Sequence, residues 1–425
     1  MIKKILSDSF LYTLANLLTK GIGFIMIPIY TAYFSTGEYG VIDLLIVTGS
    51  ILSIIIGLEI HQAVARFFPE ADSEQDKKIV VSTALWSITI FYFLFLFLSL
   101  PFMAQISSFA FNTLEYKDIL FVAFLSFGFN FIYYFFSSQL KWQLKSKQNV
   151  IVSFVYSLIT AILTYVMLKF FDGGISSVFI AQIVAAMVGI FLSYLYSKEY
   201  YGFILNFDKL KELVKFSMPL IFSTLIVYAM LYVDRVMINS YLSMEDVGLY
   251  GIAFRFASVT TLLTVGIQTA LTPLIYNNYK NGDTPISIAK LFHYFILFGV
   301  FFVGFLFIFS KEIILLFANE NYIDAHSAIP WLAISIIFSG VINFVPGIFI
   351  AKKTNYILYI NIFAFTLNLG VNTILIPNYG ILGAAYATAF SSLVYFLVYY
   401  FIGQKYYYIP FIWTNLNFNK KEKTV

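Results

Sequence analysis

The sequence has no cysteine and very little charge. Cysteine is absent from all 425 residues, which excludes disulfide frameworks and thiolate-based metal or redox sites. Charged residues make up only 11% and hydrophobic residues 60%, whereas ordinary soluble domains contain about 25% charged and about 45–50% apolar residues. A soluble fold needs a polar shell that this composition cannot supply. The composition therefore predicts a multi-pass membrane protein.

Catalytic and nucleotide-binding motifs are also missing. The chain contains no H-E-x-x-H, no G-x-S-x-G and no Walker loop. We therefore expect a protein that is not an enzyme, that uses no cofactor or metal, and that is not itself driven by ATP hydrolysis. Nothing in the distribution of Lys and Arg indicates a nucleic-acid partner.

Long apolar stretches dominate the sequence. A stretch of about 20 apolar residues can cross a membrane as a helix, and continuous stretches, unlike short alternating ones, do not form barrel strands. Twelve stretches occur, at roughly 9–33, 40–65, 79–104, 117–140, 149–169, 174–197, 213–240, 248–276, 288–310, 327–350, 355–376 and 381–403. We predict an all-α polytopic membrane protein with about twelve transmembrane helices and short loops.

Lysine and arginine are distributed very unevenly between the two sides of this arrangement. Loops on the side of the N-terminus carry 20 of the 26 Lys and Arg residues, and loops on the opposite side carry 3. The other three, Lys20, Arg235 and Arg255, lie inside spans. Cytoplasmic loops carry the excess of Lys and Arg, so both termini are predicted to be cytoplasmic.

Two pairs of segments repeat at nearly equal spacing. Tyr33, Ser35, Glu38 and Gly40 align with Tyr241, Ser243, Asp246 and Gly248, and Gly174-Ile175 with Ala181 aligns with Gly380-Ile381 with Ala387. The repeat predicts two six-helix lobes, 1–208 and 209–425, the second with a short cytoplasmic tail. An axis along the membrane normal would relate them, with a substrate path between. Chance similarity among apolar helices is the alternative.

Cations inside spans are costly and are therefore functional candidates. Lys20 lies close to the middle of the first span, on a polar stripe with Asn16 that should face a cavity. Arg235 and Arg255 lie in the seventh and eighth spans. Because Arg and Lys recognise phosphate, these cations suit a substrate that carries a pyrophosphate.

Three acids, Asp43, Glu59 and Asp234, also fall inside spans. Asp43 could pair with Lys20, and Asp234 could pair with Arg255 at similar depth. Arg235 would then be a spare cation facing a cleft, because adjacent helical residues point about 100° apart. Helical spacing places Asp43, Ser50, Gly57 and His61 on one face of the second span, and Glu59, Gln62 and Arg66 on nearly the opposite one.

Three stretches resemble a known family. They are KGIGFIMIPIYTAYFSTGEYGVIDLL at 20–45, VDRVMINSYLSMEDVGLYGIAFR at 233–255 and PNYGILGAAYATAFSSLV at 377–394. The chain resembles the polysaccharide-biosynthesis flippases, which are Wzx-type lipid-linked oligosaccharide translocases of the multidrug/oligosaccharidyl-lipid/polysaccharide (MOP) exporter superfamily. The resemblance covers nearly the whole chain.

The resemblance implies a V-shaped pair of lobes that moves an undecaprenyl-pyrophosphate-linked oligosaccharide repeat unit across the bacterial cytoplasmic membrane. The product would be O-antigen, capsule or exopolysaccharide. The partners implied are the lipid-linked oligosaccharide, membrane lipid and the polysaccharide polymerase machinery. The sequence carries no oligomer signal, so we expect a monomer. Substrate contacts would come from Lys20, Arg235, Arg255 and Asn16, and Asp43, Glu59 and Asp234 would serve ion coupling or structural ion pairs. The Asp234-Arg235 pair carries over as a family feature.

Two other functions stay open. A multidrug or ion antiporter on the same scaffold would favour an acid-rich cavity, because its drugs are mostly cations. The intramembrane cations and the Asp-Arg/Val-Gly-x-Tyr stretch favour the flippase instead. A membrane-embedded polysaccharide polymerase would need a sizeable outer loop with catalytic residues, and the loops here are short.

The predicted topology can be tested with reporter fusions. A reporter fused after Asn281 should lie in the cytoplasm and one fused after Asn319 in the periplasm, since one span separates them. Paired phosphatase and fluorescent-protein fusions measure both positions. The reverse pattern would mean that a span has been missed or added upstream.

Overall fold

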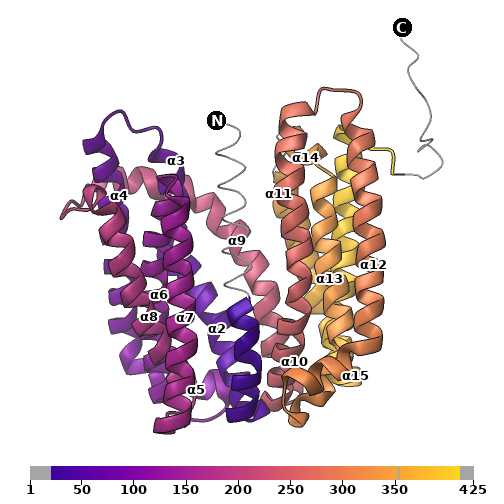
Figure 1. Ribbon diagram of the computed structural model, residues 1–425, viewed down its shortest axis with the longest axis horizontal. Helices are drawn as coiled ribbons and strands as arrows, with labels where there is room; N and C mark the ends of the chain where they lie inside the picture. Colours follow the sequence, from indigo (N-terminus) through magenta and orange to yellow (C-terminus); the bar gives the residue numbers. More distant parts are fainter. Residues whose placement is uncertain (1–20, 352, 354, 412–425) are drawn as a thin grey trace. The chain divides into compact units, whose positions relative to one another are not determined.

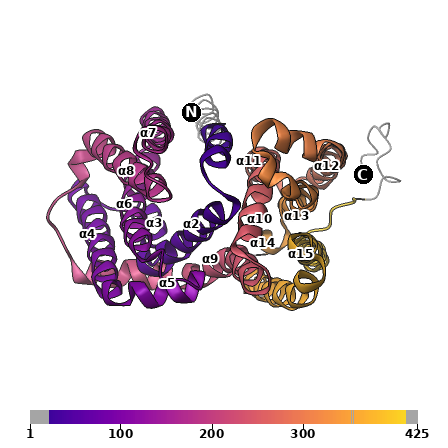
Figure 2. The ribbon, with the colours of Figure 1, turned by 90° about the horizontal axis from the view of Figure 1, so that it is seen from below.

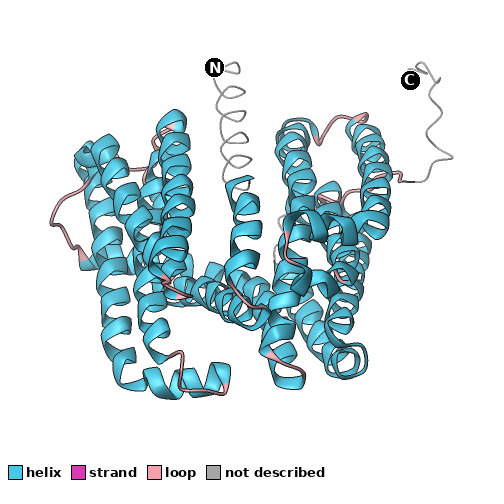
Figure 3. Ribbon diagram, turned by 60° about the horizontal axis from the view of Figure 1, so that its bottom comes forward, coloured by secondary structure: helices cyan, strands magenta, loops and turns pink. Residues whose placement is uncertain are grey.

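A computed structural model describes residues 21–351, 353 and 355–411, and these residues contain helices but no strand (Figure 3). The first described element is the helix Gly21–Tyr33. The others, labelled in Figure 1 and joined in places by short 3-10 turns, are α2 (Thr36–Gly57), α3 (Ile60–Phe67), α4 (Glu74–Ser99), α5 (Met103–Phe111), α6 (Lys117–Trp142), α7 (Ser146–Phe171), α8 (Ser176–Ser197), α9 (Phe207–Tyr241), α10 (Met244–Ala257), α11 (Thr261–Asn278), α12 (Thr284–Phe317), α13 (Ile329–Val341), α14 (Gly347–Ile350) and α15 (Asn355–Tyr406).

The described residues form ten helical segments that are long and apolar enough to cross a membrane. This confirms the predicted all-α polytopic class, and the segments fall where the apolar stretches predicted them. The last segment, α15, is interrupted at Gly380, whose φ of 61° and ψ of −142° are not helical. Pro377 lies just before it, so α15 turns between the two predicted spans 355–376 and 381–403. The count of twelve stays a prediction.

The first of two compact units comprises Met1–Gly251 with Phe317–Tyr322. Within it, α6, α7 and α8 lie side by side (Figure 2). Asn130 of α6 joins these helices: its amide nitrogen donates to Gln182 of α8 at 3.2 Å, and its amide oxygen accepts from the hydroxyl of Tyr156 of α7. Lipid tails are as apolar as the helix surfaces, so such polar bonds add to the packing that holds membrane helices together.

The second unit comprises Ile252–Leu316 and Ile323–Val425. Here α13 packs along α15, and Val345, Ile348, Ile360 and Tyr399 form a buried apolar cluster. The ring nitrogen Nε2 of His293 lies 2.9 Å from the carbonyl oxygen of Phe411, which ties the chain after α15 back to α12. These units are defined by packing, whereas the predicted lobes 1–208 and 209–425 are defined by helix count, so the lobe boundary stays a prediction.

The repeated residues of the sequence play equivalent structural roles. Ser35 caps α2 by accepting from the backbone N–H of Glu38, and Ser243 accepts in the same way from Asp246 at the start of α10. In each case the serine hydroxyl is also hydrogen-bonded to the acid side chain, much as in a capping box. The second pair behaves alike, because Gly174 and Gly380 both have positive φ, 52° and 61°. Similar roles at nearly equal spacing favour a true internal repeat over chance similarity.

The helices α2 and α10 cross where the repeated glycines meet. A Cβ atom on Gly40 would overlap the carbonyl oxygen of Met244, and a Cβ atom on Gly248 would overlap that of Thr36. Only glycine allows two backbones to approach this closely, as at other membrane helix crossings built from small residues. The crossing lies within the first unit and fixes the start of α10 against α2.

We expect Gly248→Val to lower the free energy of unfolding by ~1–3 kcal/mol, because overpacking at a closed contact forces the backbones apart. Thermal unfolding in detergent, monitored by the size-exclusion profile of the protein, measures the loss of stability. Gly304→Ala is the matched control, since a Cβ atom at Gly304 of α12 meets nothing within 4 Å. Equal stability of Gly248→Val and Gly304→Ala would contradict the close crossing.

Candidate functional site

A buried ion pair joins α2 to α9. The guanidinium Nε of Arg235 donates to Oδ2 of Asp43 at 2.7 Å, and Nη1 donates to the carbonyl oxygen of Leu231 at 3.0 Å. The side chains of Arg235 and Asp43 are only 2% and 12% exposed. A charge buried to this extent is stable only when it is paired and hydrogen-bonded. Asp43 therefore gives Arg235 the partner that a buried cation needs.

Tyr250 of α10 connects this pair to the adjacent acid. The guanidinium of Arg235 lies over the Tyr250 ring, 5.4 Å from its centroid, and the Tyr250 hydroxyl donates to Oδ2 of Asp234 at 2.8 Å. Asp234 and Tyr250 are both buried. Asp234 and Arg235 thus both contact Tyr250, Asp234 through the hydroxyl and Arg235 over the ring, while Arg235 alone is paired with Asp43.

The partner of Arg235 differs from the sequence-based expectation. Arg235 is not a spare cation, because it is paired with Asp43; periodicity along one helix cannot tell which side chain a neighbouring helix presents. The predicted Asp234–Arg255 pair joins residues of the two separately described units, and it stays a prediction. Lys20 and Asn16 lie outside the described residues, so the predicted Lys20–Asp43 pair also stays a prediction.

The second predicted span breaks into α2 and α3 at Leu58 and Glu59. Both residues have left-handed backbone conformations, with φ of 50° and 51°. Side chains other than glycine rarely adopt such angles, at a cost of ~1–3 kcal/mol each, and strain of this kind gathers at functional sites. Glu59 precedes α3 as its N-cap residue, without capping the helix through its side chain. The break therefore carries a free-energy cost that favourable interactions elsewhere must offset.

A polar pocket of about 330 Å³ lies beside this break, within the first unit. Four elements supply its walls: Ser50, Ser53 and Ile54 of α2, Glu59, His61 and Gln62 at and after the break, Asn130, Phe131 and Tyr134 of α6, and Thr224 and Tyr228 of α9. We call this site the α3 pocket. A polar pocket among membrane-spanning helices is expensive to bury and is a functional candidate for that reason.

Glu59 is the one carboxylate of the α3 pocket and is 4% exposed. Its Oε2 accepts from the Gln62 amide at 2.6 Å and lies 3.6 Å from Nε2 of His61. The His61 ring meets the Tyr134 ring edge-on at 5.1 Å. The Gln62 amide and the His61 ring thus lie beside the carboxylate, and Tyr134 packs against that ring.

The prediction of two opposite polar faces on the second span is wrong. Ser50, Glu59, His61 and Gln62 all line the same pocket, because the left-handed turn at Leu58 and Glu59 reorients the chain between α2 and α3. Arg66 lies in the last turn of α3, where its exposed side chain pairs with Glu70. Gly57 directly precedes the break, but the two residues with left-handed backbones are Leu58 and Glu59, so helical periodicity continued through the break does not reveal it.

Other residues of the α3 pocket were missed from the sequence. Asn130 is a single amide in the apolar run FLSFGFNFIYYFF of α6, and this isolation was the signal that could have found it. Tyr134, Thr224 and Tyr228 carried no comparable signal, because Tyr and Thr are common in this chain's spans. Their role comes from the way α6 and α9 pack against α2 and α3.

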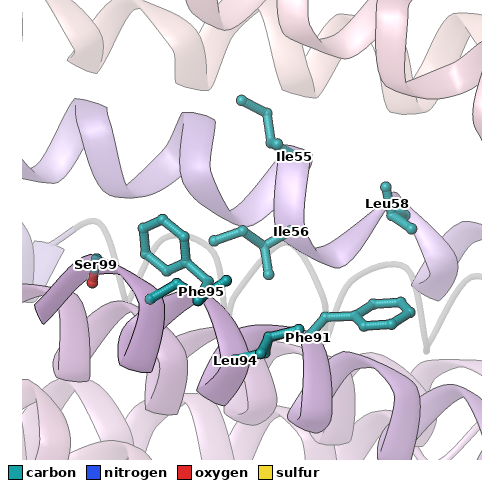
Figure 4. Close-up of a pocket in the computed structure, with 8 residues that line it drawn as sticks. Ile55, Ile56, Leu58, Phe91, Leu94, Phe95 and Ser99 are labelled. Atoms are coloured by element: carbon teal, nitrogen blue, oxygen red, sulfur yellow. The ribbon is translucent and has the colours of Figure 1, made fainter.

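The other side of the α2 end faces an apolar groove of about 470 Å³ (Figure 4). Ile55, Ile56 and Leu58 form one wall, and Phe91, Leu94 and Phe95 of α4 contribute to the other. Ile55 and Leu94 are about half exposed, which suits a surface covered by lipid. The end of α2 therefore separates an apolar surface from the polar α3 pocket.

Comparisons with known proteins show what the chain is similar to. The sequence model of a family described as "Polysaccharide biosynthesis protein" matches residues 5–279, and the MatE model matches residues 219–374. An uncharacterized membrane protein of Methanocaldococcus jannaschii is 23% identical, over 92% of this chain and 96% of its own length.

Two solved structures share the fold. One is the inward-facing conformation of a multidrug resistance MATE family transporter of the MOP superfamily, with a TM-score of 0.75 and 16% identity over 92% of this chain and 94% of that one. The other is the lipid II flippase MurJ in an inward closed conformation, with a TM-score of 0.75 and 18% identity over 93% and 87%. These likenesses confirm the fold class that was predicted from the sequence.

The Asp43–Arg235 pair can be tested with a double-mutant cycle. Asp43→Ala and Arg235→Ala should each cost ~3–5 kcal/mol of stability, because each leaves the other charge buried without its partner. The double variant should lose clearly less than the sum. Unfolding of the purified protein in detergent measures all three.

The exposed Lys209–Glu212 pair of α9 is the matched control. The same cycle on that pair should give an interaction within ~1 kcal/mol of zero, since water screens exposed charges. Additive losses at Asp43 and Arg235 would contradict the buried pair.

Proposed function

Because the chain belongs to the polysaccharide biosynthesis protein family, we propose that it is a flippase for a lipid-linked oligosaccharide. In this proposal an undecaprenyl-pyrophosphate-linked repeat unit moves across the bacterial cytoplasmic membrane to supply O-antigen, capsule or exopolysaccharide. The observation that carries the proposal is the family match over residues 5–279, which includes the α3 pocket and the Asp43–Arg235 pair. The lipid II flippase MurJ, which shares the fold, adds support.

The intramembrane charges divide into two roles in this proposal. Asp43 and Arg235 hold α2 against α9, and Asp234 holds Tyr250. Lys20 and Arg255, together with Asn16, contact the pyrophosphate, because a cation in the apolar interior is the natural partner of that dianionic group. Of the three intramembrane acids, Glu59 is the one that lines the α3 pocket, which makes it the candidate for substrate or ion contact.

A multidrug antiporter is the second candidate. The MatE model matches residues 219–374, and a MATE family transporter shares the fold with a TM-score of 0.75. Cationic drugs would need acidic groups in the transport path, and Glu59 is the one carboxylate that lines the α3 pocket. The cations Lys20 and Arg255 favour the anionic lipid-linked substrate instead.

Complementation of a strain that lacks its oligosaccharide flippase tests the proposal. The full chain should restore surface polysaccharide and clear the lipid-linked intermediate that is trapped on the cytoplasmic side. Lys20→Ala should abolish restoration at an unchanged protein level in the membrane, whereas Lys211→Ala, an exposed lysine of α9, should not.

The same strain distinguishes the two candidates. If the chain raises drug resistance and leaves surface polysaccharide absent in several host strains with different repeat units, the flippase proposal is wrong. Normal polysaccharide in the Lys20→Ala strain would remove Lys20 from the substrate site while leaving the flippase proposal in place.

A further inference from the structure

The α3 pocket has the size and composition of a small-molecule site. Its volume of about 330 Å³ lies at the lower end of the ~300–1,000 Å³ found for such sites. That volume suits one small ring system and is too small for a whole oligosaccharide. Side chains from α2, α3, α6 and α9 converge on it, so a ligand there would contact four helices at once.

The groups around the pocket are those that bind hydroxyl groups. Ser50, Ser53 and Thr224 donate their hydroxyl hydrogens to carbonyl oxygens one turn back, at 3.1, 2.7 and 3.0 Å. Each hydroxyl oxygen therefore keeps lone pairs for an incoming donor. His61 also lines the pocket, and its buried Nδ1 has no hydrogen-bond partner in the described structure.

Glu59 supplies the strongest acceptor. Its Oε2 is engaged by Gln62, and its Oε1 makes no hydrogen bond within the described residues. A buried carboxylate accepts hydrogen bonds that are shorter and about twice as strong as those of neutral groups. The left-handed backbone at Leu58 and Glu59 brings this carboxylate to the pocket wall, which accounts for the strain at the break.

An aromatic ring completes the pocket. Tyr134 is 46% exposed although it lies within a span, and it offers both a ring surface and a hydroxyl group. A pyranose ring has the matching chemistry, with an apolar face for the tyrosine and hydroxyl groups for the acceptors. A lipid tail would leave the Glu59 carboxylate oxygen Oε1 and the remaining lone pairs of the pocket hydroxyls without donors.

We infer that the α3 pocket binds one sugar ring of the transported substrate, and that the ring is neutral or carries an amino group. This inference rests on the proposed flippase function and names the part of the substrate that the pocket recognises. Glu59 is the one acid lining the pocket, and the Nζ of Lys141 on α6 lies outside the lining, 5.9 Å from the centroid of the Tyr134 ring. An acidic sugar would bring a second carboxylate beside Glu59, and like charges at such a site repel.

The α3 pocket is therefore separate in chemistry from any pyrophosphate site. A diphosphate needs cations, which the pocket lining lacks. Sugar hydroxyls and an ammonium group need acceptors, which the lining supplies. Substrate selection by sugar identity and retention of the pyrophosphate thus fall to different residues of the chain.

Saturation-transfer NMR on the full chain in lipid nanodiscs tests the inference. The probes are methyl β-glucoside, methyl β-glucosaminide and methyl β-glucuronide, which differ in charge on the same ring. We expect saturation transfer to the first two and at least fivefold weaker transfer to the glucuronide. Glu59→Gln keeps the side-chain shape and removes its charge, so the discrimination against the glucuronide should fall below twofold. Glu212→Gln, an exposed glutamate of α9, should leave it unchanged.

Tyr134→Ala gives a second, independent reading. It should lower transfer to the glucoside at least threefold, because the ring that covers the sugar face is lost. Absence of transfer to all three probes, equal transfer to all three, or unchanged discrimination in Glu59→Gln would overturn the inference. So would unchanged transfer in Tyr134→Ala, since that result identifies nonspecific contact.

The binding measurement does not depend on transport. If complementation fails while the discrimination by Glu59 holds, the flippase proposal is wrong and the sugar site stands. If complementation succeeds while wild-type protein binds the three probes equally, the sugar site is wrong and the flippase proposal stands.

Discussion

A charge inside a membrane-spanning helix must find its partner within the protein, and Arg235 shows how far the first unit depends on this constraint. Its side chain is 2% exposed, and its partner Asp43 belongs to a helix almost 200 residues earlier in the chain. The pair can form only if α2 and α9 lie against each other. Tyr250 extends the arrangement to α10, because its ring lies beside the guanidinium and its hydroxyl binds Asp234. One buried cation thus specifies the contact of three helices.

The glycines of the α2–α10 crossing make that ion pair geometrically possible. Gly40 and Gly248 bring the two backbones into contact, and a Cβ atom on Gly251 would meet the carboxylate carbon of Asp43. Small residues at the crossing therefore leave room for the acid side chain that Arg235 requires. Close packing and charge neutralisation depend on each other here, since neither a bulkier residue at the crossing nor an unpaired Arg235 is tolerated in an apolar interior.

Much of this fold could be predicted from the sequence, and the site could be predicted only in part. The spans follow from long apolar stretches, because a membrane imposes a length on every helix that crosses it. The turns at Gly174 and Gly380 follow from residue types that tolerate positive φ. The break at Leu58 and Glu59 could not be predicted, because neither residue type favours a left-handed backbone and tertiary packing alone holds it there. The partner of Asp43 was equally hidden, since it depends on which helix lies alongside α2.

Glu59 and Asp43 show why a set of intramembrane charges does not by itself define a site. Both are acids of the same predicted span, yet Asp43 is held by a guanidinium and Glu59 by an amide and a neighbouring imidazole ring. An acid paired with Arg has its charge neutralised and contributes to packing. Glu59 beside Gln62 and His61 has no Lys or Arg partner among the described ion pairs, and a backbone in a rare conformation presents it to the pocket. The difference lies in the partners that neighbouring helices supply, and it assigns Asp43 to the architecture and Glu59 to the pocket.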